Sequence, residues 1–265
     1  MIITVDNQAT YIYSAAQRIQ YDKPTVLFIH GAANDHSVWN TQCRYFSTHG
    51  WNALAVDLPA HGKTNGEALD SISALSEWIK KCTEILNLKN LSIVGHSMGS
   101  LIGLELASKS ESIVNQLALV GTNATMPVSD HLLETSKNKP GLAYHMINQY
   151  SFSSRAKLGK NDIPGISMLG VSIKLMQRTK PGVLHADFVA CNSYVNGITA
   201  AEKIACPTLL LLGSQDKMTP APRAKVMGEV IPNSTVKVLS GTGHALMAEQ
   251  PNQVTDCLKD FLIGT

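Results

Sequence analysis

The chain of 265 residues contains a serine in a context that is typical of a catalytic nucleophile. Ser97 is the centre of the pentapeptide GHSMG at 95–99, a G-x-S-x-G motif. An apolar run precedes the motif at 91–94 and a helical pattern follows it at 101–107, so strand, sharp turn and helix are predicted in that order. Such a turn holds the hydroxyl of Ser97 at a helix N-terminus, where free N–H groups stabilise a developing oxyanion.

A serine hydroxyl needs a base to accept its proton and a third group to orient that base. Two suitable residues follow apolar runs later in the chain: Asp216 lies just past the run at 207–213, and His244 just past the run at 235–239. Catalytic groups of an open parallel sheet gather at the carboxyl ends of its strands. We therefore expect Ser97, Asp216 and His244 to meet there, in the chain order of α/β-hydrolases.

The elements that must position these groups alternate along the chain. After a hairpin over 2–14, the predicted buried strands lie at 25–29, 52–56, 91–94, 116–121, 207–213 and 235–239, with helices at about 36–49, 68–87, 101–107, 220–230 and 249–263. This alternation predicts an α/β fold with a mostly parallel, doubly wound sheet. It breaks from 123 to 200, where short helical patterns and Pro-Gly breakers occur. We therefore predict a core at 1–122 and 201–265 and a helical cap at 123–200, inserted after the strand at 116–121.

On these motifs the chain resembles serine hydrolases of the α/β-hydrolase superfamily, in the cap-bearing esterase and acyl-hydrolase branch. The resemblance extends over nearly the whole chain. It rests on HG at 30–31, DLPAHG at 57–62, GHSMG at 95–99, GSQD at 213–216, GH at 243–244 and EQP at 249–251. Ala60 and Ser100 depart from the family pattern, because glycine is more common at both positions. Neither departure removes a catalytic group.

The resemblance implies a role for each site residue. Ser97 is the nucleophile, His244 the base and Asp216 the residue that orients the base, and the backbone N–H groups of Met98 and Ala32 form the oxyanion hole. His30 is expected to shape the oxyanion loop, whereas His61 and His96 are expected to be turn and packing residues. No cofactor is expected. No metal site is expected either, because the other histidines lack the spacing of metal ligands.

These assignments predict hydrolysis of a carboxylic ester or thioester, as in EC 3.1.1, through an acyl-enzyme on Ser97. A carbon–carbon bond hydrolase, a cofactor-free haloperoxidase or acyltransferase, and a non-catalytic ligand-binding protein of the same fold remain alternatives. Epoxide hydrolases and haloalkane dehalogenases of this fold have aspartate at the elbow, so Ser97 argues against both. The sequence predicts neither the acyl length nor the leaving group.

Composition narrows the partners. Apolar residues make up 44% and charged residues 16% of the chain, which is typical of an ordered globular protein. A net charge of +2 argues against a nucleic-acid partner. No apolar run reaches the roughly eighteen residues of a membrane span, and the N-terminal residues lack a signal-peptide pattern. Five scattered cysteines without a C-x-x-C pair favour a reduced, cytoplasmic protein. The predicted partner is a small-molecule ester or acyl substrate.

The predicted cap is more basic than the rest of the chain. Residues 123–200 contain eight basic and four acidic residues, a net charge of +4, so the remainder carries −2. Pimeloyl-acyl-carrier-protein methyl ester esterases, which are similar in length and layout, receive an acidic carrier protein on basic cap residues. Arg155, Lys157 and Lys160 form the tightest basic cluster and are the candidate contacts for a carrier or an anionic substrate. The alternative is that these charges only face solvent.

Overall fold

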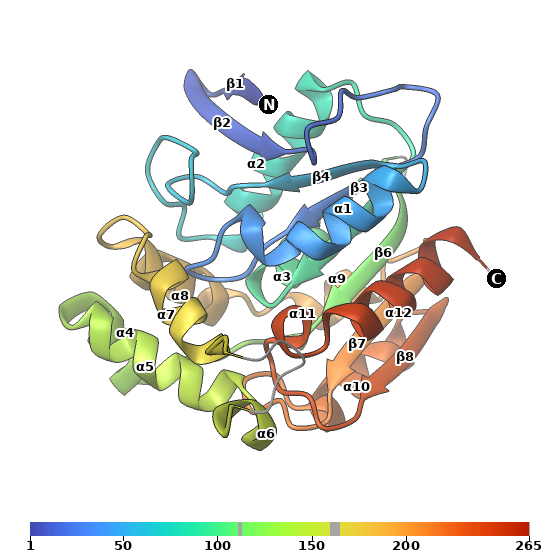
Figure 1. Ribbon diagram of the computed structural model, residues 1–265. Coiled ribbons are helices and arrows are strands. Elements are labelled where there is room, and N and C mark those ends of the chain that lie inside the picture. The colour runs from blue at the N-terminus through green and yellow to red at the C-terminus, as the bar shows by residue number, and fades with distance from the viewer. Residues whose placement is uncertain (111–112, 160–164, 265) are drawn as a thin grey trace.

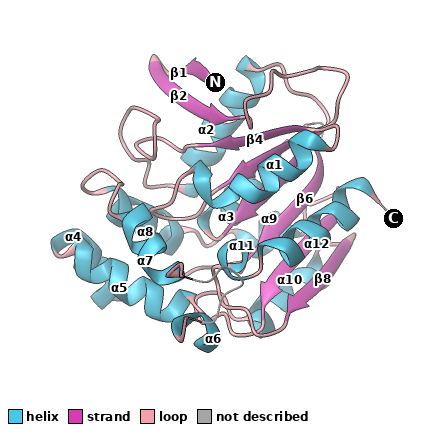
Figure 2. Ribbon diagram, in the orientation of Figure 1, coloured by secondary structure: helices cyan, strands magenta, loops and turns pink. Residues whose placement is uncertain are grey.

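The computed structural model describes residues 1–110, 113–159 and 165–264, which form one eight-stranded sheet with helices on both faces (Figures 1 and 2). The strand order is β1-β2-β4-β3-β5-β6-β7-β8. β2 pairs antiparallel with β1 and β4, and the pairs from β4 to β8 are parallel. The strands are β1 (Ile2–Val5), β2 (Gln8–Tyr13), β3 (Thr25–Ile29), β4 (Asn52–Val56), β5 (Leu91–His96), β6 (Val114–Val120), β7 (Thr208–Gly213) and β8 (Ser234–Leu239).

Two helical layers bury the two faces of the sheet. On one face α1 and α12 contact each other, and their cluster with the sheet includes Phe28, Phe46 and Leu258. On the other face α2, α3 and α10 share a cluster that includes Leu27 and Leu104. The elements of both layers are η1 (His36–Trp39), α1 (Asn40–Thr48), α2 (Ile72–Ile85), α3 (Met98–Lys109), α10 (Ala221–Val230), α11 (Leu246–Glu249) and α12 (Pro251–Ile263).

Between β6 and β7, the described residues form six further helices. They are α4 (Asp130–Asn138), α5 (Pro140–Ser151), α6 (Ser154–Lys157), α7 (Met168–Met176), α8 (Val183–Ser193) and α9 (Gly197–Ala201). α4, α5, α7 and α8 have a small hydrophobic cluster of their own, which also includes Ala33 of the core. α8 and α9 in addition contact α3, and Ala190 and Ala200 belong to the main core cluster. The boundaries of a separate cap at 123 and 200 stay predictions.

The predicted fold class, a mostly parallel doubly wound sheet with a helical insertion after β6, is confirmed. The continuous apolar runs form the central strands: β3, β4, β5 and β7 are buried along their whole length, as in a sheet covered on both faces. The last helix differs from the prediction. α11 ends at Glu249 and α12 starts at Pro251, because proline, which has no N–H, suits the first turn of a new helix.

Among the described residues, no helix combines the length and the apolar character needed to cross a membrane.

Candidate active site

Ser97 lies at the turn between β5 and α3, with φ 52° and ψ −120°. This left-handed conformation is costly for a residue with a Cβ, and close backbone packing maintains it. A Cβ on Gly95 would lie 2.1 Å from the carbonyl oxygen of Gly99, and a Cβ on Gly99 would lie 2.4 Å from that of Ile29. Only glycine fits at either position, so the sequence motif directly encodes the turn.

Hydrogen bonds hold the backbone of the elbow. The N–H of Ser97 donates to the carbonyl oxygen of Val120 at 3.0 Å. The hydroxyl of Ser100 donates to the carbonyl oxygen of Ser97 at 2.6 Å and lies 2.8 Å from Oγ1 of Thr122. Ser100, one of the two departures from the pattern of the resemblance, thus ties the elbow to the residues that follow β6 through its hydroxyl.

Asp216 and His244 follow β7 and β8 and meet at the carboxyl edge of the sheet. Nδ1 of His244 lies 2.8 Å from Oδ2 of Asp216, and both side chains are buried. Because an ionised carboxylate only accepts hydrogen bonds, Nδ1 carries the proton and Nε2 is left with a lone pair. This is the tautomer that a general base requires.

Thr219 is a further partner of Asp216 that the sequence analysis missed. Its hydroxyl donates to Oδ2 of Asp216 at 2.7 Å, and the N–H groups of Met218 and Thr219 donate to Oδ1 at 2.8 Å each. Burial raises the pKa of Asp216, but His244 and the bonds from Thr219 outweigh it, so the pKa lies below its ordinary value. The signal was present: an Asp-x-x-Thr-Pro turn places a hydroxyl three residues after the carboxylate.

The loop that carries His244 is fastened by the insertion and by β5. The N–H groups of His244 and Ala245 donate to the carbonyl oxygen of Ser151 at 2.6 and 3.2 Å. The carbonyl oxygen of His244 accepts from Nε2 of His96 at 2.9 Å. Burial lowers the pKa of His96 to about 3, so this ring is neutral. His96 is thus the packing residue that the sequence predicted, with an added backbone contact.

Glu249 joins the same loop to the insertion. Its carboxylate accepts from the N–H of Gly243 at 3.0 Å and from that of Ser153 at 3.3 Å. Burial raises the pKa of Glu249 above its ordinary value despite these bonds. The EQP motif therefore supplies a carboxylate that bridges the residue before His244 and the residue that precedes α6.

Ser97 and His244 line one cavity of about 350 Å³, together with Gly31, Ala32 and His96. Many of the other residues that line the cavity belong to the insertion between β6 and β7. Among the described lining residues, Glu249 is the one carboxylate and there is no lysine or arginine. The large apolar lining residues are Val38, Ile147, Phe152, Ile166, Met168, Val171, Leu175, Met176, Phe188, Met218 and Met247.

The two candidate oxyanion donors lie close to Ser97: Met98 follows it directly in the chain, and Ala32 lines the same cavity. Met98 is the first residue of α3, so its N–H is among those that have no acceptor inside the helix. Ala32 belongs to the loop after β3, where the hydroxymethyl group of Ser97 is a near neighbour: a Cβ on Gly31 would lie 3.1 Å from Cβ of Ser97. The described geometry therefore brings together all five residues that the sequence predicted for catalysis.

His30 holds the loop after β3, the candidate oxyanion loop, by hydrogen bonds at both ring nitrogens. Its Nε2 accepts from the N–H of Leu58 at 3.1 Å, so the proton is on Nδ1, which donates to the carbonyl oxygen of Gly31 at 2.8 Å. Burial lowers the pKa of His30 to about 4, which keeps the ring neutral. The ring therefore links the loop after β3 to the loop after β4.

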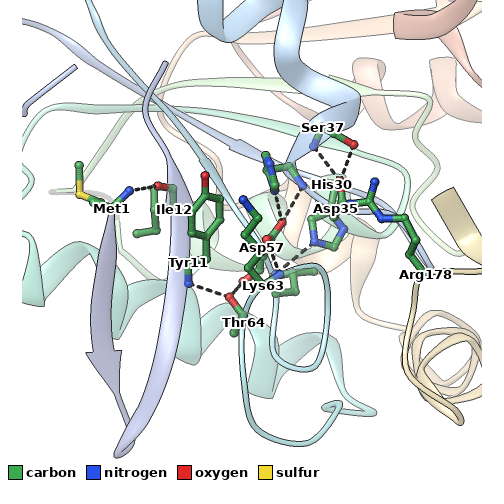
Figure 3. Close-up of polar contacts among 12 residues, drawn as sticks. Met1, Tyr11, Ile12, His30, Asp35, Ser37, Asp57, Lys63, Thr64 and Arg178 are labelled. Carbon is green, nitrogen blue, oxygen red and sulfur yellow. Dashed lines mark hydrogen bonds and ion pairs between the residues drawn. The ribbon is translucent and has the colours of Figure 1, made fainter. Parts of the chain in front are cut away.

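Asp35, His36 and Asp57 form a cluster that resembles a set of metal ligands, with one candidate atom of each within 4.8 Å of the others. Their oxygens already face donors of the protein. Asp57 accepts from His36 and from the N–H of Lys63, and Asp35 accepts from Ser37 and, at 2.7 Å, from Nη2 of Arg178 (Figure 3). Hydrogen bonding inside the protein accounts for this cluster.

The basic cluster of the insertion is described only in part. Arg155 and Lys157 lie in α6, and Nζ of Lys157 donates to the carbonyl oxygen of Gln149. Lys160 lies outside the described residues. Two other charged residues of the insertion do more than face solvent. Arg178 pairs with Asp35, and Asp187 is buried against His61.

His61 was expected to be a turn and packing residue, and it does lie in the turn after β4. Its Nε2 is also 3.0 Å from Oδ2 of Asp187, a residue of α8 that is 126 positions away in the chain. No local pattern links these two residues, so the sequence could not pair them.

Comparisons with known proteins place the chain in a family. The family model of the alpha/beta hydrolase fold matches residues 24–251, so the chain belongs to the α/β-hydrolase family. The protein is a hydrolase of the α/β fold.

Curated relatives are hydrolases of several kinds. The chain is 24% identical to (E)-2-((N-methylformamido)methylene)succinate hydrolase of Acinetobacter baylyi, over 92% of this chain and 91% of the relative. It is 24% identical to monoacylglycerol lipase ABHD6 of Rattus norvegicus, over 98% and 83% of the two chains. It is also 24% identical to the putative carbamate hydrolase RutD of Agrobacterium fabrum, over 93% and 95%.

Solved structures share the fold over the whole chain. The enol-lactonase from Burkholderia xenovorans LB400 has a TM-score of 0.89 at 18% identity, covering 99% of this chain and all (100%) of the other. The esterase EaEST from Exiguobacterium antarcticum has a TM-score of 0.86 at 20% identity, covering 99% and 98%. At these identities the likeness shows the fold alone.

Proposed function

We propose that this protein is a serine esterase that hydrolyses uncharged carboxylic esters with an apolar acyl group. The observation that carries the proposal is one cavity in which Ser97 lies at a strained elbow and His244 is oriented by Asp216 at 2.8 Å. Curated relatives that cleave a monoacylglycerol or a carbamate, by their names, support hydrolysis at an acyl carbon.

The reaction proceeds in two halves. Oγ of Ser97 attacks the carbonyl carbon, its proton passes to Nε2 of His244, and the N–H groups of Ala32 and Met98 stabilise the oxyanion. The bond to the leaving group then breaks, and the alkoxide takes the proton from Nε2. Water next attacks the acyl-enzyme and gives a proton to Nε2, and Ser97 leaves with that proton. The products are a carboxylic acid and an alcohol.

The cavity favours a short to medium acyl chain. At about 30 Å³ for each water-sized group, a volume of about 350 Å³ holds roughly twelve non-hydrogen atoms. Its walls are mainly aliphatic and Met side chains, which adapt to flexible chains. The absence of lysine and arginine among the described lining residues disfavours a substrate whose buried part is an anion.

A panel of p-nitrophenyl esters from two to sixteen acyl carbons tests this function. Burial of one methylene contributes about 0.8 kcal/mol, so kcat/KM should rise about fourfold for each added carbon, until the cavity is full at about eight carbons. Ser97→Ala should remove the activity without loss of folding. Cleavage of a diketone but of no ester would instead identify a carbon–carbon bond hydrolase, and acyl transfer to alcohol or peroxide in preference to water would identify an acyltransferase or perhydrolase.

An ester bound to an acyl carrier protein remains a prediction from the sequence. It depends on Arg155, Lys157 and Lys160 as a contact surface, and charge reversal tests it, as described below. A thioester substrate is tested by adding acyl thioesters to the same panel.

A further inference from the structure

A buried imidazole–carboxylate pair links the insertion to the core, and the proposed reaction uses neither residue. His61 follows β4 and Asp187 lies in α8, and each side chain is 1% exposed. Nε2 of His61 lies 3.0 Å from Oδ2 of Asp187. Burying two charges carries a large desolvation cost, which the contacts of this pair must offset.

The hydrogen bonds of the pair define its protonation. Nδ1 of His61 lies 2.9 Å from the carbonyl oxygen of Pro59, which can only accept. Oδ2 of Asp187 accepts from the N–H of Ala33 at 2.8 Å, and the oxygens of an ionised carboxylate can only accept, from His61 as well. Both ring nitrogens therefore donate, and His61 is an imidazolium. Burial lowers the pKa of His61, but the Asp187 carboxylate outweighs it, and the pKa lies above its ordinary value.

Ala33 connects this pair to the oxyanion hole. Its N–H belongs to the peptide group that directly follows Ala32, the candidate oxyanion donor. Ala33 has φ 53°, a left-handed conformation that is unfavourable for a residue with a Cβ. The loop therefore needs contacts from outside to keep this shape.

The peptide group on the other side of Ala32 is held by the core. The carbonyl oxygen of Gly31 accepts from Nδ1 of His30 at 2.8 Å and from the N–H of Asn34 at 3.3 Å. Two anchors thus flank the candidate donor: a neutral histidine of the core before it, and a carboxylate of the insertion after it.

We propose that Asp187, with His61 as its counter-ion, is a positioning residue that holds Ala33 so that the N–H of Ala32 is directed at the oxyanion. The insertion then completes the oxyanion hole as well as covering the cavity. This inference rests on the proposed serine-esterase function. Packing is the competing account, because Ala33 also contacts the cluster of Leu184 and Phe188 on the same helix.

Asp187→Asn separates charge from packing, because asparagine has nearly the same shape. Loss of a whole oxyanion donor costs about 10²–10³ in kcat. A misdirected donor should cost about 10- to 100-fold in kcat, with KM within about threefold of wild type. The inhibition constant of a trifluoromethyl ketone, whose hemiketal oxygen occupies the hole, should rise by the same factor as kcat falls.

Arg178→Gln is the matched control. It removes the ion pair of 2.7 Å between the insertion and Asp35 and keeps Asp187, whose Oδ2 accepts from the N–H of Ala33, so we expect kcat within about twofold of wild type. Where Asp187→Asn does not fold, the double variant His61→Gln/Asp187→Asn, which buries no charge, carries the same kinetic expectation. Wild-type kcat in the folded variant, equal losses in Asp187→Asn and Arg178→Gln, or an unchanged inhibition constant would each overturn the proposal.

A spectroscopic readout tests the pair apart from the reaction. In ¹⁵N-labelled wild-type protein at pH 6, below the ordinary histidine pKa of about 6.5, both ring nitrogens of His61 should carry a proton, and Asp187→Asn should abolish this state. A singly protonated His61 in wild type would overturn the inference even if the esterase activity is present. An absence of Ser97-dependent ester cleavage would refute the proposed function, while the spectrum still reports on the pair.

Discussion

At the scale of single residues, the candidate site depends on how its side chains are oriented. The carboxylate of Asp216 accepts from His244, Met218 and Thr219. These bonds fix the carboxylate, which in turn fixes the proton of His244 on Nδ1. In the proposed reaction Nε2 is then free to accept the proton of Ser97, so the reactivity proposed for the serine depends on a residue that does not contact it.

Asp216→Asn should therefore lower kcat by about 10³- to 10⁴-fold, the size of the effect in a serine protease triad, with KM within about threefold. The amide keeps the shape of the side chain but loses its charge, and its NH₂ group can face Nδ1 and favour the wrong tautomer. Steady-state kinetics on the preferred ester measure the effect. A loss of less than tenfold would mean that Asp216 does not orient the base.

The candidate catalytic residues could be picked out from the sequence because each has a local signal. Ser97 has glycines on both sides, and Asp216 and His244 follow buried strands. Asp187 has no such signal: its partners Ala33 and His61 lie 154 and 126 positions away. A pairing of this kind depends on how α8 packs against the core, which composition and periodicity do not encode.

At the scale of elements, the loop after β8 depends on the insertion for its shape. Ser151 accepts two N–H groups of this loop, and Glu249 bridges Gly243 and Ser153. The segment from the end of α5 to the start of α6 thereby holds the backbone of the loop that carries His244.

Glu249→Ala should lower kcat about 5- to 20-fold, because two backbone N–H groups lose a charged acceptor, a bond worth about 1.5–3 kcal/mol. Glu249→Gln keeps one carbonyl oxygen for Gly243 and should lose less, about threefold. Kinetics and thermal unfolding of both variants separate a local effect from a loss of folding. Equal activity of the alanine variant and wild type would contradict the role of this bridge.

The charge of α6 is tested by reversal. If the insertion steers an anionic or carrier-bound ester, Arg155→Glu/Lys157→Glu should lower kcat/KM for that substrate, and more at low salt, because exposed charges are screened over about 8–10 Å at physiological ionic strength. A neutral p-nitrophenyl ester should respond little. Arg223→Glu/Lys225→Glu in α10 is the control with the same change in net charge. If kcat/KM changes equally for both substrates, or equally in both variants, the basic cluster does not steer the substrate and is surface charge only.

Core elements were easier to predict than those of the insertion. Strands buried on both faces leave continuous apolar runs, and the predicted ranges at 25–29 and 52–56 match β3 and β4 residue by residue. α4 to α9 have shorter and less regular patterns, because their apolar faces are divided between the cavity, a small local cluster and the main core. Their number and bounds therefore came only from the structure.

At the scale of the whole molecule, the pair of His61 and Asp187 should make stability depend on pH. The folded-state pKa of His61 is raised above its ordinary value of about 6.5, so the folded state binds the proton more tightly than the unfolded state. The resulting stabilisation is complete below about pH 6.5 and is lost as the pH rises through the folded-state pKa.

Urea unfolding of wild type and of His61→Gln/Asp187→Asn between pH 6 and 9 measures this linkage. As the pH rises, the free energy of unfolding of wild type should fall relative to that of the double variant. His30 and Asp57 also face His61, and both are present in the two proteins. If the difference in free energy of unfolding between the two proteins stays constant, or if wild type gains stability relative to the double variant as the pH rises, His61 and Asp187 are not a charged pair.

Covalent labelling tests whether Ser97 is the nucleophile of a hydrolase. A fluorophosphonate reacts with a serine that has an active base and oxyanion hole. We predict one phosphonyl group per chain, located on Ser97 by peptide mass spectrometry, with esterase activity lost in step with labelling and no labelling of Ser97→Ala. Full activity after complete labelling of Ser97, or loss of activity through a label on another residue, would contradict the account.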